Sequence, residues 1–388
     1  MFANSSLKIC FSAGESSGDN HAANVYLELK KQFPNTTAIG MGGTKMSQAG
    51  ISLCYDSSQI GVIGVIEVLK HYVEIRRALH KMQQLLLNER PDLLICVDYK
   101  EFNYQLAKFA KKNGIKVLFY VGPQVWAWRK SRVKKYGAVI DMMAVIFPFE
   151  TIYYEAENVP VRYVGHPSID KVIPRFSKAE ALKKFALNSD APIIGLVAGS
   201  RVNEIKRLLP IMLRAAKQLK IDFPNCQFIL PQADSISDSL IERYLQKTDV
   251  KVLVIKEQPY DVMQCCDAIM TCSGTATLEI ALLGIPMVIC YRLNFLTYLL
   301  GKMLVKTRFI GLPNIIFGEK IINELIQHEA TIENMVNEIH RLLTNSEANQ
   351  NIRADLEIVR KKLGTGGGIK NMVALIIEQL TLKTTSMV

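Results

Sequence analysis

Short apolar runs recur along most of the chain, and stretches of helical periodicity separate them. The runs are continuous in Val, Ile and Leu, which is typical of strands buried on both faces. In chain order they span 7–12, 37–41, 93–98, 116–121, 142–147, 192–197, 227–231, 251–255, 268–271 and 286–291. Strands that alternate with helices form parallel sheets through right-handed crossovers. The sequence therefore predicts an α/β fold built from doubly wound, Rossmann-like sheets.

The alternation breaks near residues 165–190, a stretch that contains Pro167 and Pro174 and ends in polar residues. A chain of 388 residues is also longer than one hydrophobic core usually supports. We therefore predict two Rossmann-like domains, over residues 1–170 and 171–345. Residues 346–388 carry only helical spacing, and the sequence leaves open whether this helical segment packs back on the first domain.

Ligands of open α/β sheets bind beyond the carboxyl ends of the strands, and the polar clusters of this chain lie there. The first run leads into S-A-G-E-S-S-G-D (12–19), where glycines and a helix amino terminus suit an anionic ligand. The cluster as a whole is a candidate anion site; the alternative is that Ser17 or Asp19 only caps the helix. The spacing is not G-x-G-x-x-G, so an NAD site is poorly supported and no cofactor is predicted.

The third run ends in D-Y-K-E-F-N (98–103). Asp98 directly follows a predicted buried strand, so we expect it to face the ligand cleft. Desolvation there raises a carboxyl pKa toward the range of a working general base. Asp98 is therefore a candidate catalytic base, although a carboxylate that caps the next helix fits this segment equally well.

Both tryptophans of the chain lie in V-W-A-W-R (125–129), two residues apart and next to basic residues. Aromatic faces beside cations suit sugar rings or stacked bases, and an arginine suits a phosphate. Trp126 and Arg129 are therefore candidate substrate-binding residues. Core packing explains one tryptophan well, but it explains the pair with its basic neighbours less well.

Two small polar turns in the second half of the chain follow apolar runs and open helices, G-S-R (199–201) and S-G-T-A-T-L-E (273–279). Amides and hydroxyls at a helix amino terminus suit a diphosphate, as does an arginine. A glutamate one turn further along suits the hydroxyls of a ribose; a solvated surface glutamate is the alternative. The candidate nucleotide contacts are Arg201, Ser273, Gly274, Thr275 and Glu279. No metal-binding cluster stands out, and no metal is predicted.

Lys and Arg outnumber Asp and Glu by 47 to 36, and the net charge of +11 favours anionic partners. The basic residues are spread out without a recognised binding module, so nucleic acid is not an expected partner. The eight cysteines are scattered without a C-x-x-C pair, which is typical of free thiols in a reducing compartment. No secretory signal is indicated, and no apolar stretch approaches the roughly 20 residues that cross a bilayer.

Two stretches combine an apolar face with flanking cations, 61–81 and 293–306. Such faces suit the surface of an anionic bilayer. For each stretch alone, a core helix with a basic edge is an equally good interpretation. The net charge favours the membrane interpretation of the two together.

Taken together, these segments resemble the lipid-A-disaccharide synthases, which are inverting glycosyltransferases of the GT-B architecture. The resemblance runs from about residue 8 to about residue 330. It includes A-G-E-S-S-G-D (13–19), G-V-I-G-V-I-E-V-L (61–69), V-W-A-W-R (125–129), F-P-F-E (147–150), V-G-H-P (164–167), G-S-R (199–201), S-G-T-A-T-L-E (273–279), P-M-V-I-C-Y-R (286–292) and L-P-N (312–314). It implies two domains that face across a cleft, the first on the acceptor and lipid side and the second binding the UDP-sugar.

The resemblance implies that the chain joins UDP-2,3-diacylglucosamine to 2,3-diacylglucosamine 1-phosphate through a β-1,6 link and releases UDP. Asp98 matches the family's essential acidic residue, and Glu15 is the next candidate for the base. Glu15 and Ser17 match the family's amino-terminal loop, and Arg201, Glu279 and Asn314 match polar positions expected around UDP. The resemblance also makes Ser17 and Asn103 candidate substrate-binding residues. The resemblance also implies a cytoplasmic enzyme on the inner face of the bacterial inner membrane, and it is compatible with a homodimer.

Three segments depart from the family's pattern. The familiar D-A-P-D-F-N reads D-Y-K-E-F-N (98–103), S-P-S before V-W-A-W reads G-P-Q (122–124), and L-P-G-S-R reads V-A-G-S-R (197–201). These changes concern the acceptor side more than the fold. They leave two alternatives open: another GT-B enzyme that uses UDP-N-acetylglucosamine, and a catalytically silent relative that binds a nucleotide or a lipid.

Overall fold

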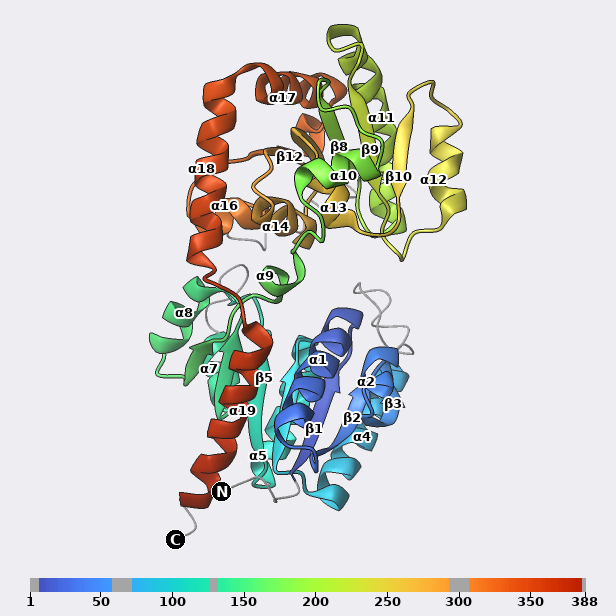
Figure 1. The fold of residues 1–388 in the computed structure, drawn as a ribbon. Coiled ribbons are helices and arrows are strands. Elements are labelled where there is room, and N and C mark those ends of the chain that lie inside the picture. Colours follow the sequence, from blue (N-terminus) through green and yellow to red (C-terminus); the bar gives the residue numbers. More distant parts are fainter. Residues whose placement is uncertain (1–6, 58–71, 126–131, 293–306, 386–388) are drawn as a thin grey trace. The chain divides into compact units, whose positions relative to one another are not determined.

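The chain forms two compact units, and each contains one parallel sheet with helices (Figure 1). The computed structural model describes residues 7–57, 72–125, 132–292 and 307–385. The first unit comprises Met1–Pro167 and Gly366–Val388, and the second comprises Ser168–Thr365. The last helix of the chain therefore belongs to the first unit, whereas the helix before it belongs to the second.

The sheet of the first unit has seven strands in the order β3-β2-β1-β4-β5-β6-β7, all paired in parallel. The strands are β1 (Lys8–Ala13), β2 (Thr37–Gly42), β3 (Ser52–Asp56), β4 (Leu93–Val97), β5 (Lys116–Tyr120), β6 (Met142–Val145) and β7 (Val161–Tyr163). The α-helices are α1 (Ser16–Gln32), α2 (Thr44–Gln48), α4 (Tyr72–Glu89), α5 (Lys100–Lys112), α7 (Arg132–Gly137), α8 (Thr151–Glu155) and α19 (Gly368–Thr385).

The side chains of β4 alternate between two cores, one on each face of this sheet. Leu93, Ile95 and Val97 pack on one face with α1 and α19. Leu94 and Cys96 pack on the other face with α4 and α5. All five side chains are buried. A strand that helices cover on both faces has no solvent-exposed side, which is why this run carries no polar residue.

Helix α19 packs against α1 and closes the first unit. Lys116 Nζ donates to the Gln379 carbonyl at 2.8 Å. Gly165, with φ +104°, lies so close to the start of α19 that an added Cβ would come within 3.1 Å of the Gly368 Cα. Both the backbone conformation and the available space therefore require glycine at position 165.

The sheet of the second unit has six parallel strands in the order β10-β9-β8-β11-β12-β13. The strands are β8 (Ile193–Val197), β9 (Gln227–Pro231), β10 (Val252–Ile255), β11 (Ala268–Cys272), β12 (Met287–Tyr291) and β13 (Asn323–Ile326). The α-helices are α9 (Pro167–Lys171), α10 (Lys178–Lys184), α11 (Val202–Asp222), α12 (Asp238–Leu245), α13 (Pro259–Met263), α14 (Thr275–Leu282), α16 (Leu312–Phe317), α17 (Ile332–Thr344) and α18 (Ser346–Lys362). Among the residues described in both units, no helix is long and apolar enough to cross a membrane.

Both sheets share the Rossmann strand order, in which the first strand lies beside the fourth. The order reverses between β1 and β4 in the first unit and between β8 and β11 in the second. The crevice beyond the carboxyl ends of such a strand pair is where open α/β sheets bind ligands. The predicted α/β fold, with two doubly wound sheets and carboxyl-terminal helices, is confirmed.

Three strands were not predicted from the sequence: β3, β7 and β13. Each lies at the edge of its sheet. No residue of β7 or β13 is fully buried, and β3 buries only Tyr55. An edge strand that is partly exposed does not need a continuous apolar run, so its sequence carries little strand signal.

Candidate functional site

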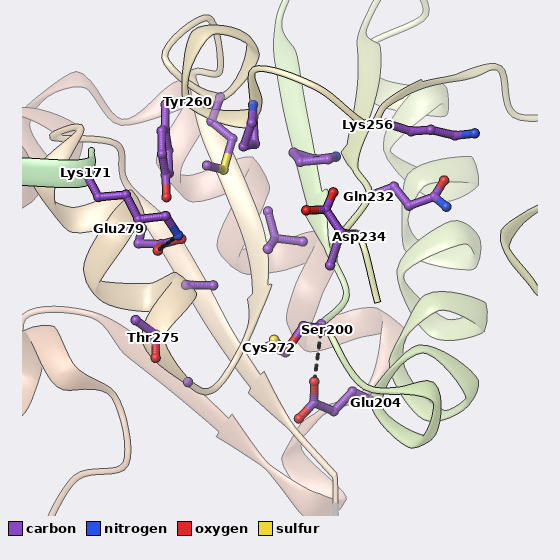
Figure 2. Close-up of a pocket in the computed structure, with 18 of the residues that line it drawn as sticks. Lys171, Ser200, Glu204, Gln232, Asp234, Lys256, Tyr260, Cys272, Thr275 and Glu279 are labelled. Atoms are coloured by element: carbon purple, nitrogen blue, oxygen red, sulfur yellow. Dashed lines mark hydrogen bonds and ion pairs between the residues drawn. The ribbon is translucent and has the colours of Figure 1, made fainter. Parts of the chain in front are cut away.

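The second unit holds a cavity of about 760 Å³ at the carboxyl ends of its strands (Figure 2). It is lined by Val197, Pro231 and Cys272, the last residues of β8, β9 and β11. The cavity therefore lies where the strand order of this sheet reverses. Its volume falls within the range of roughly 300–1,000 Å³ that is typical of small-molecule sites.

Helix α14 begins at the cavity wall, with Ser273 and Gly274 before it and Thr275 as its first residue. Gly274 has φ +145°, and an added Cβ would meet no described heavy atom within 4 Å. The backbone conformation, rather than crowding, therefore requires this glycine. A glycine supplies no capping side chain. The N–H of Thr277 bonds to the Gly274 carbonyl at 3.1 Å, whereas no described bond engages the N–H groups of Thr275 and Ala276, which favour an anion.

The carboxylate of Glu204 occupies the turn before α11. Its Oε2 accepts hydrogen bonds from the backbone N–H groups of Ser200 at 3.1 Å and Arg201 at 3.2 Å. Its Oε1 lies 3.2 Å from Arg201 Nη1. The Arg201 side chain, which lines the cavity, is 66% exposed. Glu204 was not predicted, although its position three residues after the N-cap is the spacing of a capping box.

A second carboxylate of the cavity, Glu279 on α14, is also ion-paired. Lys171 Nζ on α9 lies 3.2 Å from Glu279 Oε1 and 5.7 Å from the ring centroid of Tyr260, and Figure 2 shows the three side chains together. Burial lowers the pKa of Lys171, but Glu279 and Tyr260 outweigh burial and the pKa is raised. Burial and Glu279 raise the pKa of Tyr260. Lys171 and Tyr260 were not predicted, because no local motif connects them with Glu279.

The charged side chains that line the cavity balance one another. The cations are Lys171, Arg175, Arg201 and Lys256, and the anions are Glu204, Asp234, Glu257 and Glu279. An anionic ligand would therefore depend on local donors such as the start of α14, rather than on a net positive charge. Among the residues that the structure describes, no group of three or more His, Cys, Asp or Glu could hold a metal ion.

The first unit places two predicted acids at its own switch point. Ala13 of β1 pairs with Val97 of β4, so Glu15 and Asp98 follow neighbouring strand ends. Both residues are partly buried. Burial raises the pKa of the Asp98 carboxyl above its ordinary value, and Lys100 opposes this shift. A carboxylate in such a place holds a proton more readily than a solvated one.

Tyr99 packs against the turn that follows β1. A Cβ added to Gly14 would lie 2.2 Å from the Tyr99 ring, so the ring takes the space that any larger residue would need. Asp98 and Tyr99 both have left-handed backbones, with φ of +48° and +46°. Burial, Glu15 and Tyr55 raise the pKa of Tyr99 to about 12. Tyr99, which replaces the alanine of the family's D-A-P-D-F-N, therefore fills the space between the ends of β1 and β4.

Nearly the whole chain matches one family of known proteins. Residues 9–374 match the model of a family described as lipid-A-disaccharide synthetase. The chain belongs to the lipid-A-disaccharide synthase family. It is 45% identical over 380 residues to the lipid-A-disaccharide synthase of Geobacter sulfurreducens, covering 98% of this chain and 99% of that protein. It is 40% identical over 368 residues to that of Coxiella burnetii strain CbuG_Q212, covering 95% of this chain and 97% of the relative.

Solved structures share the fold of the family member described here. The structure of S. aureus MnaA with UDP has a TM-score of 0.65 at 13% identity and covers 97% of each chain. A UDP-GlcNAc 2-epimerase from Neisseria meningitidis, bound to UDP-GlcNAc, has a TM-score of 0.63 at 14% identity and covers 96% of this chain. Identities this low carry the fold alone. The family assignment, and with it the predicted hexosyltransferase class, rests on the closer relatives and is confirmed by them.

Two polar residues of the family's pattern have no surface to offer a ligand. Asn314 is fully buried; its Nδ2 donates to the Ile322 carbonyl and to Glu324, and its Oδ1 accepts from the N–H groups of Ile321 and Ile322. These four bonds use the whole hydrogen-bonding capacity of the amide. Asn103 is also fully buried. In this structure both side chains are therefore engaged by hydrogen bonds within the chain itself.

The remaining predicted residues lie elsewhere. Ser17 is exposed in the first turn of α1. Trp126 and Arg129 lie outside the residues that the structure describes. Asp19, the alternative cap of α1, caps α2 instead. Its carboxylate accepts hydrogen bonds from three backbone N–H groups, those of Gly43, Lys45 and Met46.

Proposed function

We propose that the chain transfers diacylglucosamine from UDP-2,3-diacylglucosamine to the 6-hydroxyl of 2,3-diacylglucosamine 1-phosphate, with inversion, and that Asp98 is the general base. One observation carries the proposal: the partly buried Asp98 carboxyl, whose pKa burial raises, follows β4 at the switch point of the first sheet. Deprotonating an alcohol during attack requires a base that holds the proton well and faces the ligand crevice. The cavity at the corresponding point of the second sheet supports a nucleotide-binding role for that unit.

In the proposed step, Asp98 takes the proton of the acceptor's 6-hydroxyl while that oxygen forms a bond to the anomeric carbon of the donor. The bond between this carbon and the UDP oxygen breaks, and UDP leaves with the electron pair. Arg201 and the N–H groups at the start of α14 stabilise the charge that develops on the diphosphate. Glu15, at the neighbouring strand end, is the alternative base.

For the nucleotide, we place the diphosphate at Ser273, Gly274 and Thr275, and the ribose hydroxyls at Glu279. The partly buried Glu279 carboxylate lies one helical turn beyond Thr275 on α14, within reach of the same wall of the cavity. Backbone N–H groups at a helix start suit phosphate, and a carboxylate accepts from two hydroxyls. Three residues stay proposed substrate contacts on the strength of their motifs alone: Ser17, Trp126 and Arg129.

We further propose that the 61–81 face contacts the anionic inner surface of the bacterial inner membrane. Residues 61–71 and 293–306 lie outside the described part of the chain, and α4 begins at Tyr72. Tyr72 is 54% and Val73 61% exposed, and Arg76 and Arg77 beside them are exposed too. Apolar side chains next to arginines suit the boundary between headgroups and acyl chains. A homodimer is proposed from the family resemblance alone.

The test is acceptor-dependent release of UDP by the purified protein. Wild type, Asp98→Asn and Asp92→Asn are mixed with UDP-2,3-diacylglucosamine, with and without 2,3-diacylglucosamine 1-phosphate. Asp92 is the matched control, since it lies before the start of β4, where its carboxylate accepts from the Lys8 N–H. We expect Asp98→Asn to lower the rate by a factor of about 10² to 10⁴, and Asp92→Asn to retain activity.

Calorimetric titration with UDP shows whether an inactive Asp98→Asn variant lacks only the base or is also misfolded. Asp98→Asn should bind UDP as wild type does, because the proposed nucleotide contacts lie in the second unit. An Asp98→Asn rate within threefold of wild type would reassign the base, with Glu15 tested next. Absence of acceptor-dependent release by wild type, despite UDP binding, would refute the proposed acceptor.

A further inference from the structure

The side chain of Asn103, on α5, joins the carboxyl ends of β1 and β4. It has no exposed surface. Its Nδ2 lies within hydrogen-bonding distance of three carbonyl oxygens, those of Ser12 at 3.1 Å, Val97 at 3.3 Å and Asp98 at 2.8 Å. Its Oδ1 accepts from Ser12 Oγ at 2.6 Å. One amide therefore bridges the two strands between which the strand order reverses.

Asn103 also binds both residues of the left-handed turn that follows β4. The backbone N–H of Asn103 donates to the Tyr99 carbonyl at 3.1 Å, and its Nδ2 donates to the Asp98 carbonyl at 2.8 Å. Asp98 and Tyr99 have φ of +48° and +46°. Residues with a Cβ keep this conformation only where neighbouring groups hold them, and Asn103 supplies two of those bonds.

We propose that Asn103 is a positioning residue of the transfer reaction: it fixes the Asp98–Tyr99 turn, and so the direction of the Asp98 carboxylate, without contacting substrate. This inference rests on the proposed role of Asp98 as the base. The Asp98 carbonyl is the nearest to Nδ2 of the three carbonyl oxygens, so a change at position 103 acts on Asp98 directly.

The chemistry of the site requires an amide. Three carbonyl oxygens face Nδ2, and a hydroxyl donates to Oδ1, so the side chain must donate at one end and accept at the other. Aspartate is nearly the same shape, but its ionised form would place a negative charge against three carbonyl oxygens. Its protonated form can still donate one hydrogen bond. Asn103→Asp therefore makes the hydrogen bonds that hold the Asp98–Tyr99 turn depend on pH, because the introduced carboxyl loses its donor when it ionises.

The described titratable groups around the substituted position lie on β4, on the turn after it and on helices α5 and α7: Cys96, Asp98, Tyr99, Lys100 and Tyr136. The Cys96 thiol of β4 is 3.8 Å from the Asn103 carbonyl oxygen, and burial raises its pKa, so it stays neutral across the range of the assay. Burial also raises the pKa of Tyr99 and of Tyr136, so both hydroxyls stay neutral there. Lys100 opposes the rise in the pKa of the Asp98 carboxyl, and Asp98 is the acid whose backbone carbonyl Asn103 binds. Repulsion between Asp98 and an ionised Asp at position 103 acts in the same direction as the lost donor, so both effects grow as pH rises.

The experiment measures kcat and the acceptor KM from about pH 5.5 to pH 9 for wild type, Asn103→Asp and Asn113→Asp. Asn113 is the matched control, since it ends the same helix and donates to the Phe109 carbonyl at 2.8 Å, but is exposed. We expect Asn103→Asp to lose kcat by about tenfold or more at pH 8, with acceptor KM within about twofold. The deficit should shrink as pH falls, whereas Asn113→Asp should follow wild type at every pH.

Ser12→Ala is a milder test of the same hydrogen bonds, because it removes only the hydroxyl that donates to Asn103 Oδ1. We expect kcat to fall about threefold and the pH midpoint of kcat to move, with UDP affinity unchanged. If Asn103→Asp does not fold, Ser12→Ala carries the test. Wild-type kcat and an unshifted midpoint in Ser12→Ala would then overturn the proposal.

Asp98→Asn, assayed in parallel, shows whether a negative result refutes the role of Asp98 as the base or only the positioning role of Asn103. If Asp98→Asn is active, the base is wrongly assigned and the positioning role falls with it. If Asp98→Asn is inactive but Asn103→Asp keeps wild-type kcat and pH profile, only the role of Asn103 is refuted. A loss in Asn103→Asp that is equal at every pH would assign Asn103 to folding alone, and would also refute the proposal.

Discussion

Lys171 Nζ lies 3.2 Å from Glu279 Oε1, so helix α9 is ion-paired with α14 at the wall of the cavity in the second unit. The glutamate is the more enclosed partner, with its side chain 17% exposed against 66% for the lysine. Exposed ion pairs contribute little to stability, whereas a partly enclosed carboxylate is well placed to accept hydrogen bonds from a ligand. We therefore expect the pair to affect the proposed binding of a nucleotide more than the stability of the fold.

Glu279→Gln should weaken UDP binding by about 10- to 100-fold, because two ribose hydroxyls would lose a charged acceptor. Calorimetric titration of UDP into the variant measures the change. Glu242→Gln is the control, since Glu242 is exposed on α12 and does not line the cavity. Equal UDP affinity in wild type and Glu279→Gln would move the ribose away from α14.

The raised pKa of Asp98 predicts an acid limb in the rate profile. As pH falls through that pKa, the base becomes protonated and kcat/KM should decrease, with a midpoint above the ordinary carboxyl value of about 3.8. Rates between pH 4.5 and pH 8, with unfolding followed at each pH, measure the midpoint. A profile that is flat down to the pH at which the protein unfolds would contradict the base assignment.

The same shift in pKa predicts that the ionised Asp98 carboxylate destabilises the folded protein. A carboxyl whose pKa is raised on folding binds its proton more tightly in the folded chain, so its stability contribution is present at low pH and is lost as pH rises through the folded pKa. Asp98→Asn should therefore have a higher Tm than wild type at pH 7.5, and the difference should shrink toward pH 4.5. A variant of lower Tm at pH 7.5 would show that the ionised carboxylate stabilises the fold.

Val73→Glu should weaken binding to vesicles that contain phosphatidylglycerol by about tenfold, because burying a valine side chain in an apolar environment stabilises by about 1.5–3 kcal/mol. Cosedimentation at fixed lipid concentration measures the loss. Ile221→Glu is the matched control, since Ile221 is 76% exposed near the end of α11 and carries no predicted membrane role. Equal losses in both variants would indicate general electrostatic repulsion rather than a docked face.

Gly165→Ala should destabilise the protein more than Gly114→Ala. Both glycines have positive φ, +104° and +73°, so alanine is strained at either position. Only Gly165 is crowded: an added Cβ would lie 3.1 Å from Gly368, whereas at Gly114 it would meet no described atom within 4 Å. We expect a cost of about 1 kcal/mol at 114 and about 2–4 kcal/mol at 165, measured by urea unfolding. Equal costs would mean that α19 moves away without loss.

Family, enzyme class and fold could be predicted because their signals are local or lie in ordered motifs. Leu93–Val97 is buried throughout, so its composition alone marks a strand between two helix layers. Arg201, Gly274 and Asp98 could be named as candidates because each lies within a few residues after a strand. The edge strand Val161–Tyr163 escaped prediction because an exposed edge does not need an apolar run.

The sequence by itself determined the central strands and their alternation with helices, the polar turns after those strands and the family to which the chain belongs. Only the tertiary structure decided what the polar side chains do. Asn103 and Asn314 match the motif of a substrate site, yet both are fully buried among backbone groups. Lys171 meets Glu279 although 108 residues separate them. The reason is physical: a residue's type sets which hydrogen bonds it can form, but the packing of distant segments sets which partners it meets.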